Sequence, residues 1–241
     1  MEAAGHEPEP ALLCGEAVPT QAAFEAGSPA MKAFGRLLAD AAHHAVPVLL
    51  VGERGTGKTT FAHALHAMSS RAGRPFVRVD CPAASGDLKI QARAARGGTL
   101  FLDEVAELSH AQQAAALRIL QDVATHRFRV VASTGHDLQE EMSTGAFRKD
   151  LFYRLDILEI RIPPLRERVE DILPIARAFV SSRARSEARP PPTLSPALEQ
   201  ALLRYAWPGN VQELLSVLER MLILSPGSCL DVTALPERVS G

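Results

Sequence analysis

Short apolar runs recur along the chain and alternate with stretches of helical periodicity. Each run is rich in aliphatic, β-branched or aromatic residues and is bounded by residues that break regular structure. The five runs lie at Pro47 to Val51, Phe76 to Val79, Thr99 to Leu102, Phe128 to Ala132 and Ile157 to Ile162. Because strands that alternate with helices form parallel sheets, this pattern predicts a doubly wound α/β fold with ligand chemistry at the carboxyl ends of the strands.

Beyond Pro163-Pro164 the strand signal stops and helical periodicity takes over. Three helices are expected there, over Val169 to Val180, Ser195 to Tyr205 and Asn210 to Leu224. Asn210 followed by Glu213 is a helix-start signal, and it comes directly after the break at Trp207-Pro208-Gly209. The sequence therefore predicts a small all-helical domain after the sheet.

The remaining boundaries follow from where regular patterns begin and end. Residues up to about Phe24 carry no sustained period, so 1–24 are expected to form a flexible tail. The α/β domain is placed at 25–168 and the helical domain at 169–235. With 241 residues and 46% hydrophobic content, the chain can supply a core for one α/β domain and a small second one.

Composition and charge exclude several classes of protein but do not identify the function. The formal net charge is −2 and no basic stripe stands out, which argues against a dedicated nucleic-acid surface. Three widely spaced cysteines without a CxxC pair indicate neither a disulfide framework nor a zinc site. The acidic, proline-containing start is unlike a signal peptide, and no apolar run reaches membrane-spanning length. We expect a soluble, cytoplasmic protein.

The first apolar run leads into a glycine-rich segment that matches the phosphate-binding pattern G-x-x-x-x-G-K-[ST] at every fixed position. The segment is Gly52-Glu53-Arg54-Gly55-Thr56-Gly57-Lys58-Thr59, with Thr60 next. Glycines let backbone N–H groups turn toward a polyphosphate, Lys58 adds a cation for the β- and γ-phosphates, and the Thr59 hydroxyl suits Mg²⁺. An ordinary glycine-rich turn is the alternative, but the expected strand before it and helix after it favour a P-loop.

The third apolar run ends in two carboxylates, Asp103 and Glu104. In a P-loop fold Asp103 would hold Mg²⁺, directly or through water, and Glu104 would polarise the attacking water. Many strands end in solvated acids, so the pair alone is a weak signal. Its place on the third strand of a P-loop sheet makes it a candidate catalytic pair.

At this point the chain resembles a known family, the AAA+ domain of the sigma-54-dependent transcriptional activators, or bacterial enhancer-binding proteins. Five blocks in the family's order carry the resemblance, which spans roughly Ser28 to Leu235. They are the P-loop, Gly97-Gly98-Thr99-Leu100-Phe101-Leu102-Asp103-Glu104, Phe147-Arg148-Lys149-Asp150-Leu151-Phe152-Tyr153-Arg154-Leu155, Pro163-Pro164-Leu165-Arg166-Glu167-Arg168 and Trp207-Pro208-Gly209-Asn210-Val211.

The resemblance implies an AAA+ core with a helical lid and ATP bound with Mg²⁺ between the subunits of a ring. It also implies that Arg148 and Arg154 act as arginine fingers toward a neighbour's nucleotide. Such a finger stabilises charge on the transferred phosphoryl group and is worth about 10³–10⁵ in rate. For an arbitrary arginine, a solvated or ion-paired side chain is the alternative. The partners implied are further copies of the chain or related AAA+ subunits, together with a protein of unknown identity.

The chain departs from the family outside the nucleotide site. The family's G-A-F-T-G-A loop, which touches sigma-54, is absent, and only Pro82 to Arg96 bridges the second and third strands. The companion segment Asp122 to Arg127 is also short. We expect no receiver domain before the core and no helix-turn-helix after Leu235. We therefore expect neither remodelling of sigma-54 in the familiar way nor specific DNA binding.

The nucleotide site departs as well. Gly135 stands where the family usually has a sensor asparagine, with Thr134 a candidate substitute, and Gln212 stands where the lid usually has an arginine. Asp80 replaces an asparagine thought to restrain the catalytic glutamate; close to Glu104, it would raise the pKa of one of the two carboxyls. Thr59, where the family often has glutamate, restores the general Mg²⁺ ligand.

Two functions remain open from the sequence. The first is an AAA+ ATPase with slow hydrolysis at subunit interfaces, using Lys58, Asp103, Glu104, Arg148 and Arg154. The alternative is a catalytically degenerate module whose nucleotide only sets oligomer state, or which joins and modulates related AAA+ rings. A P-loop kinase or small-molecule phosphotransferase fits poorly, because the family blocks extend well beyond the P-loop.

Overall fold

The structure is a computed structural model, and it describes residues 24, 27–83, 88–121, 127–225 and 227–240. The chain divides into two compact units. The first contains Arg36–Arg54 and Lys58–Ile162. The second contains Pro163–Gly241, Gly55–Gly57 and the described residues up to Gly35. Of the predicted features, most of the 1–24 tail, part of the Pro82 to Arg96 bridge and most of Asp122 to Arg127 lie outside the described residues.

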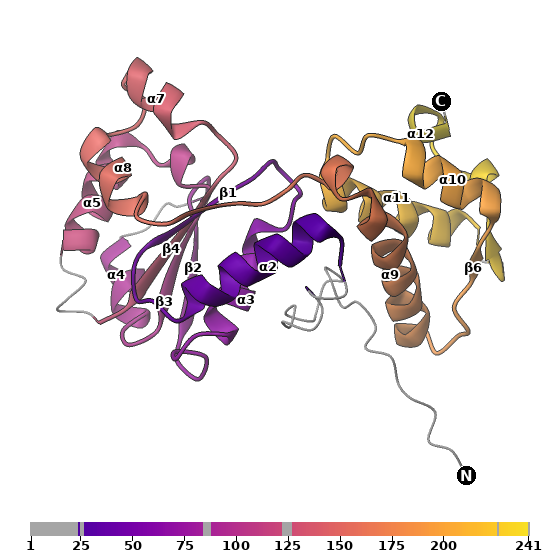
Figure 1. Cartoon of the computed structure of the whole chain (residues 1–241), viewed down its shortest axis with the longest axis horizontal. Coiled ribbons are helices and arrows are strands. Elements are labelled where there is room, and N and C mark those ends of the chain that lie inside the picture. The colour runs from indigo at the N-terminus through magenta and orange to yellow at the C-terminus, as the bar shows by residue number, and fades with distance from the viewer. Residues whose placement is uncertain (1–23, 25–26, 84–87, 122–126, 226, 241) are drawn as a thin grey trace, which may run out of the picture. The chain divides into compact units, whose positions relative to one another are not determined.

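The first unit is built on a five-stranded parallel sheet with strand order β2-β3-β4-β1-β5 (Figure 1). The strands are β1 Val48–Val51, β2 Phe76–Asp80, β3 Thr99–Asp103, β4 Arg129–Thr134 and β5 Glu159–Arg161. All pairings are parallel, and each strand overlaps one of the five apolar runs. The predicted doubly wound parallel sheet is therefore confirmed.

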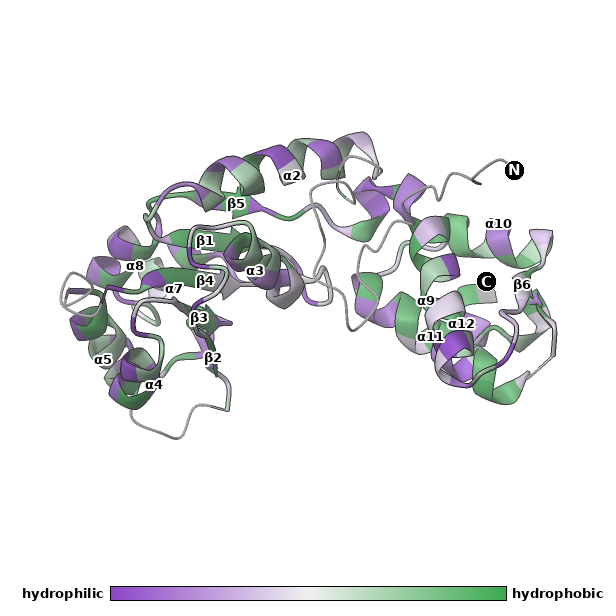
Figure 2. Ribbon diagram, turned by 90° about the horizontal axis from the view of Figure 1, so that it is seen from below, coloured by the Kyte–Doolittle hydropathy of each residue, from purple (hydrophilic) through white to green (hydrophobic). Residues whose placement is uncertain are grey.

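Helices cover both faces of this sheet, as the crossover connections of a parallel sheet require (Figure 1). The helices of the first unit are α3 Lys58–Ala67, α4 Leu88–Ala94, α5 His110–Gln121, α7 Leu138–Thr144 and α8 Lys149–Leu155. Helix α2, Pro29–Ala42, runs from the second unit into the first, and Figure 2 shows hydrophilic and hydrophobic residues alternating along it.

The period-2 alternation of strand side chains separates the hydrophobic core from the chemistry. On β3, Leu100 and Leu102 join a buried cluster with residues of α4, α5 and α8. Phe101 and Asp103 point to the opposite face, because successive side chains on a strand alternate. The polar end of β3 thus emerges on the face that carries α3, directly beside the P-loop that precedes this helix.

The second unit is mainly helical, with α9 Ile172–Ser186, α10 Pro196–Arg204, α11 Asn210–Leu224 and the short α12 Glu237–Ser240. The three helices expected from the sequence are confirmed. The unit also contains a small parallel pair that the sequence did not predict, β6 Thr193–Leu194 with β7 Cys229–Leu230. Two paired residues per strand are too few to leave a periodic signal.

Helix α11 starts at the predicted residue, but Asn210 and Glu213 bond to different backbone groups. Glu213 reaches back so that its carboxylate accepts the Gly209 N–H at 2.9 Å, as in a capping box. Asn210, buried in the same turn, instead accepts the Leu165 N–H at 2.8 Å and ties α11 to the chain after Pro163-Pro164. Trp207 is fully buried and donates its indole N–H to the Leu202 carbonyl.

Phe24, at the end of the predicted tail, is a buried residue of the second unit. Its ring packs 6.0 Å from that of Phe34, and a Cβ on Gly35 would lie 2.5 Å from the Cβ of Phe24. Gly35 therefore has to be glycine for Phe24 to pack on this helix. An isolated apolar residue in an aperiodic segment gives no sequence signal of this kind.

Candidate nucleotide-binding site

The P-loop joins the end of β1 to the start of α3, the arrangement its sequence pattern predicts. Gly55 and Gly57 have φ of 81° and 101°, in the left-handed region that favours glycine. Helix α3 begins at Lys58, so the N–H groups of its first turn lack intrahelical partners and face the loop. Such a loop and helix end form a ready anion site.

The centre of the P-loop is held by contacts inside the second unit. The buried Arg168 guanidinium donates to the Thr56 carbonyl at 3.1 Å, and the Gln212 N–H donates to the Gly55 carbonyl at 3.3 Å. A Cβ on Gly55 would lie 2.2 Å from the Gly209 carbonyl oxygen, so no other residue fits there. Burial lowers the pKa of Arg168 to about 10, which leaves it charged at neutral pH. Because Gln212 acts here through its backbone, its side chain is free to change.

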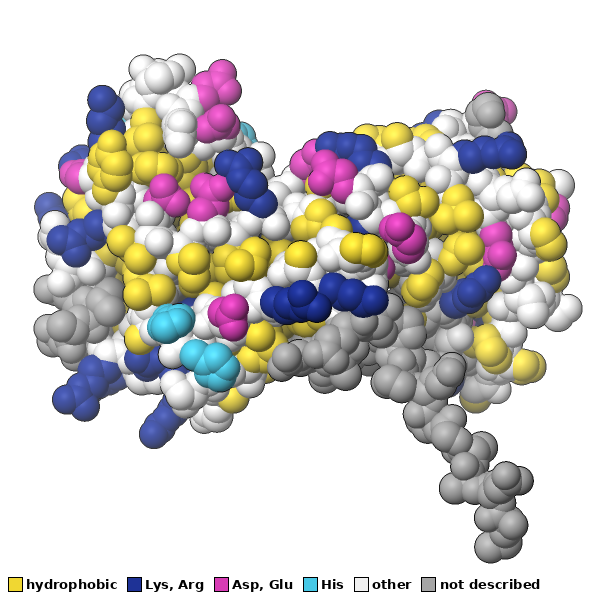
Figure 3. Space-filling view, in the orientation of Figure 1, with side chains coloured by type: hydrophobic (Ala, Val, Ile, Leu, Met, Phe, Trp, Pro, Cys, Tyr) yellow, Lys and Arg dark blue, Asp and Glu magenta, His cyan; other side chains and the backbone are white. Residues whose placement is uncertain are grey.

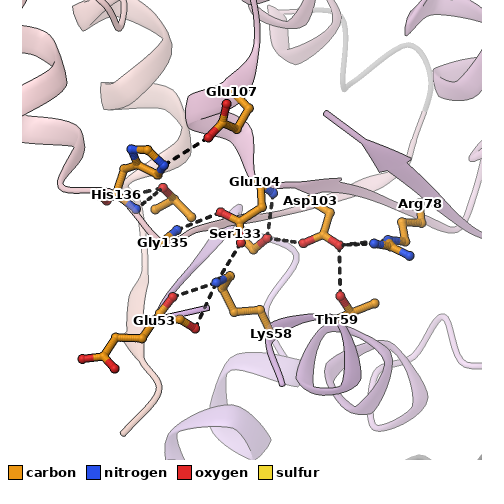
Figure 4. A network of polar contacts seen from close by, with 12 residues as sticks. Glu53, Lys58, Thr59, Arg78, Asp103, Glu104, Glu107, Ser133, Gly135 and His136 are labelled. Carbon is orange, nitrogen blue, oxygen red and sulfur yellow. Dashed lines mark hydrogen bonds and ion pairs between the residues drawn. The ribbon is translucent and has the colours of Figure 1, made fainter. Parts of the chain in front are cut away.

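Lys58 lies at the mouth of the loop with its ammonium fully engaged (Figure 4). Its Nζ donates to the carbonyls of Gly52 at 2.7 Å and Glu53 at 3.2 Å, and it forms an ion pair with Glu104 Oε1 at 2.8 Å. Only 6% of the lysine side chain is exposed. These contacts fix a cation beside the glycine loop, where a phosphate would need it.

Asp103 ends β3 as a buried carboxylate with partners on both oxygens (Figure 4). Its Oδ1 accepts the Ser133 hydroxyl at 2.6 Å, and its Oδ2 accepts the Thr59 hydroxyl at 2.9 Å. The two residues predicted to hold Mg²⁺ are therefore within hydrogen-bond distance of each other. A carboxylate and a hydroxyl are the hard oxygen ligands that Mg²⁺ takes alongside water and phosphate, so the residues fit the ion.

Glu104 follows in a strained backbone conformation, with φ 59° and ψ 60°. A non-glycine residue in this left-handed region costs about 1–3 kcal/mol, and such outliers cluster at functional sites. The Ser133 hydroxyl accepts the Glu104 N–H at 3.0 Å, which helps to hold this conformation. The Glu104 carboxylate is shared between Lys58 and the Gly135 N–H, which donates to Oε2 at 2.9 Å.

Gly135 thus contacts the Glu104 carboxylate through its backbone, at the position where the family usually has an amide side chain. A Cβ built on Gly135 would lie 3.5 Å from Lys58 Nζ and 3.6 Å from Glu104 Oε2, which is ordinary contact distance. A side chain at this position would therefore start within the site. Thr134 does not substitute for the missing amide, because its hydroxyl is bonded to the backbone of His136 in the following turn.

Asp80 lies at the exposed end of β2, in register with Asp103. The contacts of the described Glu104 carboxylate are with Lys58 and Gly135, so the structure shows no direct pairing of Asp80 with Glu104. Both still act on Cys81: burial, then the charges of Asp103, Asp80 and Glu104, raise the pKa of its thiol to about 12.

The two predicted arginine fingers are exposed on the first unit, Arg148 directly before α8 and Arg154 in its last turn. Arg148 precedes the helix; its N–H donates to Gln113, and its guanidinium makes a two-point pair with Asp150 at 3.0 and 2.7 Å. This pairing raises the pKa of Arg148. Arg154 is exposed in the last turn. Among the described residues, neither guanidinium has a hydrogen bond or ion pair with the Lys58–Glu104 network.

Two members of the network, Ser133 and Arg78, were not identified from the sequence. Ser133 bridges Asp103 and the Glu104 backbone, and Arg78 pairs with Asp103 from the neighbouring strand β2. Both lie in the interiors of strands and belong to no motif. Only the alternation of side chains along each strand could have identified them. Because β2, β3 and β4 are neighbours, Arg78 and Ser133 lie on the same face of the sheet as Asp103.

No helix among the described residues is both long and apolar enough to cross a membrane.

Two histidines of α3 make packing and hydrogen-bond contacts with the sheet. The His63 ring packs on Phe76 with centroids 4.0 Å apart, and His66 forms a hydrogen bond with the Thr99 hydroxyl. These histidines contribute to packing beneath the sheet.

Comparisons with known proteins agree with this geometry. Residues 26–165 match the Sigma-54 interaction domain, and residues 166–241 match the AAA+ ATPase lid domain. The chain is 37% identical over 244 residues to the transcriptional regulatory protein ZraR of Klebsiella oxytoca, covering 89% of this chain and 55% of that protein. It is 40% identical over 220 residues to the Nif-specific regulatory protein of Azotobacter vinelandii, covering 78% and 42%.

Solved structures give the same result. NtrX from Brucella abortus in complex with ADP superposes with a TM-score of 0.83 at 29% identity, covering 89% of this chain and 55% of that one. Its complex with ATP gives a TM-score of 0.81, covering 88% and 56%. The chain spans about half the length of the curated relatives it matches. It belongs to the Sigma-54 interaction domain family of AAA+ proteins, related to the sigma-54-dependent transcriptional regulators.

Proposed function

We propose that this chain binds Mg·ATP at its P-loop and hydrolyses it slowly at interfaces between subunits, as part of a transcription-regulating assembly. One observation carries the proposal: Lys58, Thr59, Asp103 and Glu104, from two motifs far apart in sequence, meet in a single network. The NtrX structures with ADP and ATP, at 29% identity, support nucleotide as the ligand.

Each residue of the network has a role that its present contacts support. Lys58 now neutralises Glu104, and a β- or γ-phosphate in the loop would offer it a stronger anion. That exchange would release one oxygen of Glu104 to orient the attacking water. Thr59 and Asp103 would hold Mg²⁺, which supplies charge neutralisation on the phosphate oxygens. The remaining charge that develops in the transition state needs a cation that the described network does not supply.

Arg148 and Arg154 are the proposed source of that cation, from a neighbouring subunit. They are exposed around α8, while the buried residues of this helix, Leu151, Phe152 and Leu155, anchor it to the core. A helix anchored by its buried face, with exposed arginines in front of it and in its last turn, suits a contact in trans. The assembly proposed is a ring of this chain, alone or with related AAA+ subunits.

A second candidate function is a nucleotide-regulated binding module without useful turnover. The observation that favours it is the Glu104 carboxylate, whose two oxygens are both occupied within the chain, one of them by a backbone N–H that ATP cannot displace by charge. Gly135 and Gln212 also leave the site without the amide and the cation that relatives use. In this case the nucleotide would set only the oligomeric state or the grip on a partner.

The proposals for sigma-54 and for DNA rest on the sequence. The G-A-F-T-G-A hexapeptide does not occur in the chain, so we propose that the protein alone does not activate sigma-54-dependent transcription. Figure 3 shows Lys and Arg side chains scattered among acidic and apolar ones on the face in view, which supports weak, non-specific DNA binding. Open-complex formation at a sigma-54 promoter with purified components tests the first statement; activation by this protein alone would refute it.

Nucleotide binding is tested by calorimetry with Lys58→Ala. Removing two or more charge-assisted contacts to phosphate should weaken ATP binding by about 100-fold. Lys32→Ala, which removes an exposed lysine of α2, is the matched control and should bind as wild type does. Equal affinity of Lys58→Ala and wild type would refute the P-loop assignment.

Hydrolysis in trans is tested by turnover measured against protein concentration. A site completed by a neighbour's arginine gives activity per subunit that rises with concentration until the ring is formed. Activity per subunit that is constant over the whole range of assembly would refute hydrolysis at interfaces. Absence of turnover throughout, with Lys58-dependent binding, would favour the binding module.

A further inference from the structure

The carboxylate predicted to receive Mg²⁺ already has a cation bound to it. Arg78 Nη2 lies 2.7 Å from Asp103 Oδ2, and Arg78 Nε donates to the same oxygen at 2.9 Å (Figure 4). The Thr59 hydroxyl donates to this oxygen too. Oδ2 is therefore the common point of Arg78, Thr59 and Asp103, which is where a metal ion held by Thr59 and Asp103 would be placed.

The two partners differ sharply in exposure. The Arg78 side chain is 47% exposed, whereas that of Asp103 is 7% exposed. A buried carboxylate needs a compensating charge or several hydrogen bonds, since losing its hydration is costly. Arg78 reaches in from the surface of β2 to provide that charge, and its long stem lets it return to solvent. Asp103 thus obtains its counter-charge from Arg78, whereas the half-exposed Arg78 can be hydrated without Asp103.

The other cation near the site does not take this place. Lys58 is directed to Glu104 and to the carbonyls of Gly52 and Glu53. Asp103 Oδ1 is satisfied by Ser133. Within the described network, Arg78 is the cation that neutralises Asp103.

We propose that Arg78 is an exchangeable stand-in for Mg²⁺: it holds Asp103 while the metal is absent and leaves Oδ2 when the metal binds. A guanidinium and a divalent ion compete for one carboxylate oxygen, because both draw on its lone pairs and their like charges repel. Arg78 therefore competes with Mg²⁺ and sets the metal concentration that the site requires. This inference rests on the proposed nucleotide-binding function.

Competition predicts a tighter metal site once Arg78 is removed. Loss of one half-exposed, charge-assisted contact should lower the half-saturating metal concentration by about 10-fold in Arg78→Ala. Arg78→Gln, which keeps a hydrogen-bond donor without the charge, should shift in the same direction by less. Arg78→Lys, which keeps the charge, should stay closest to wild type.

The direct experiment is a titration of the ADP-bound protein with Mn²⁺, followed by electron paramagnetic resonance, with Mg²⁺ added to compete. The control is Arg118→Ala, which removes an exposed arginine of α5 away from this network. The expected order of metal affinity is Arg78→Ala, then Arg78→Gln, then wild type together with Arg118→Ala. An unchanged or weaker metal affinity in both Arg78→Ala and Arg78→Gln would overturn the proposal.

Thermal stability gives an independent readout that does not depend on catalysis. In EDTA, Arg78→Ala should melt below wild type, because Asp103 has lost its counter-charge. With ADP and saturating Mg²⁺, the difference should shrink, since the metal then supplies the charge in both proteins. A difference that persists unchanged would mean that Arg78 is only structural. If ADP binding itself proves independent of Lys58, the proposed function fails; if binding depends on Lys58 but the metal titrations coincide, this inference alone fails.

Discussion

Charged side chains at the carboxyl end of the sheet and around helix α8 differ in burial and in the number of their partners. At the sheet, Lys58 and Asp103 are buried, and each is held by several partners from different elements. Around α8, Arg148 and Arg154 are exposed, and Arg148 is paired only with Asp150, two residues further along. Both regions carry charges that the proposed hydrolysis would use, but only the carboxyl end of the sheet holds them through several partners.

This difference assigns separate tasks to the two regions. Breaking a buried, multiply bonded charge network is costly, so the sheet end can hold its geometry before ligand arrives. An exposed Arg–Asp pair contributes little and exchanges partners readily. On the proposed function, the phosphate-binding residues are arranged within one chain, while Arg148 and Arg154 would serve a neighbouring subunit. Each of the following changes tests one side of that contrast.

The largest effect is expected from Arg154→Ala. If Arg154 completes a neighbour's site, turnover should fall by about 10³-fold while ATP binding is unchanged. Steady-state hydrolysis and calorimetry on the same preparation measure both quantities, with Arg118→Ala as the control. A parallel loss of binding and turnover would place Arg154 in the chain's own phosphate site and erase the contrast.

Glu104→Gln should reduce turnover by about 100-fold or more, because the amide cannot polarise water. Binding should be retained, since Lys58 and the loop are intact. Glu107→Gln is a matched control, because Glu107 lies three residues after Glu104 and its carboxylate pairs with His136. Single-turnover measurements with excess protein distinguish lost chemistry from lost assembly, and normal turnover in Glu104→Gln would remove the catalytic assignment.

A smaller gain is expected when the family's residues are restored. Gly135→Asn with Gln212→Arg should raise turnover by about 10-fold, an effect equivalent to about 1.4 kcal/mol in the transition state. A Cβ at position 135 would be at ordinary contact distances, and the contact of Gln212 with Gly55 is through the backbone. Gly135→Ala adds the Cβ without the amide and should not accelerate. No change in the double variant would favour the binding module.

The smallest effect is expected from Asp150→Asn, which frees Arg148. The pKa of Asp150 is lowered by this pair, so its contribution is present above the ordinary value of 3.8 and is lost only as the pH falls below it. At neutral pH, removing so exposed a pair should leave the melting temperature unchanged. Turnover should rise by about two-fold if Arg148 is then freer to reach a neighbour. A clear drop in melting temperature would show that the pair is structural.

The sequence predicted those parts of the molecule that depend on local spacing. The P-loop, the Asp103-Glu104 pair and the start of α11 each depend on residues within one short segment, where backbone geometry fixes the side chains. Arg78 and Ser133 could not be found this way, because their roles depend on which strands are neighbours. The strand order β2-β3-β4-β1-β5 brings them to Asp103, and the order is not written in any one segment.

Two further differences have similar causes. That Gly135 stands at a sensor position stays a prediction, and its N–H bond to Glu104 could not be predicted because it depends on the strained turn after β3. The expected pKa change for Asp80 or Glu104 depended on the two carboxyls lying close together; the Glu104 carboxylate contacts Lys58 and Gly135, while Asp80 is exposed. The role of Arg148 and Arg154 in trans stays a prediction, since it concerns a second subunit.

The most direct test of the contrast between the two regions is to mix two inactive variants. Glu104→Gln keeps the arginines of α8, and Arg154→Ala keeps the phosphate site. In a head-to-tail ring assembled at random from equal amounts, about a quarter of the interfaces would pair an intact Glu104 with an intact Arg154 from the next subunit. We predict that the mixture recovers about a quarter of wild-type turnover, although neither variant alone is active. A mixture as inactive as its components, in conditions where wild type turns over, would contradict the account.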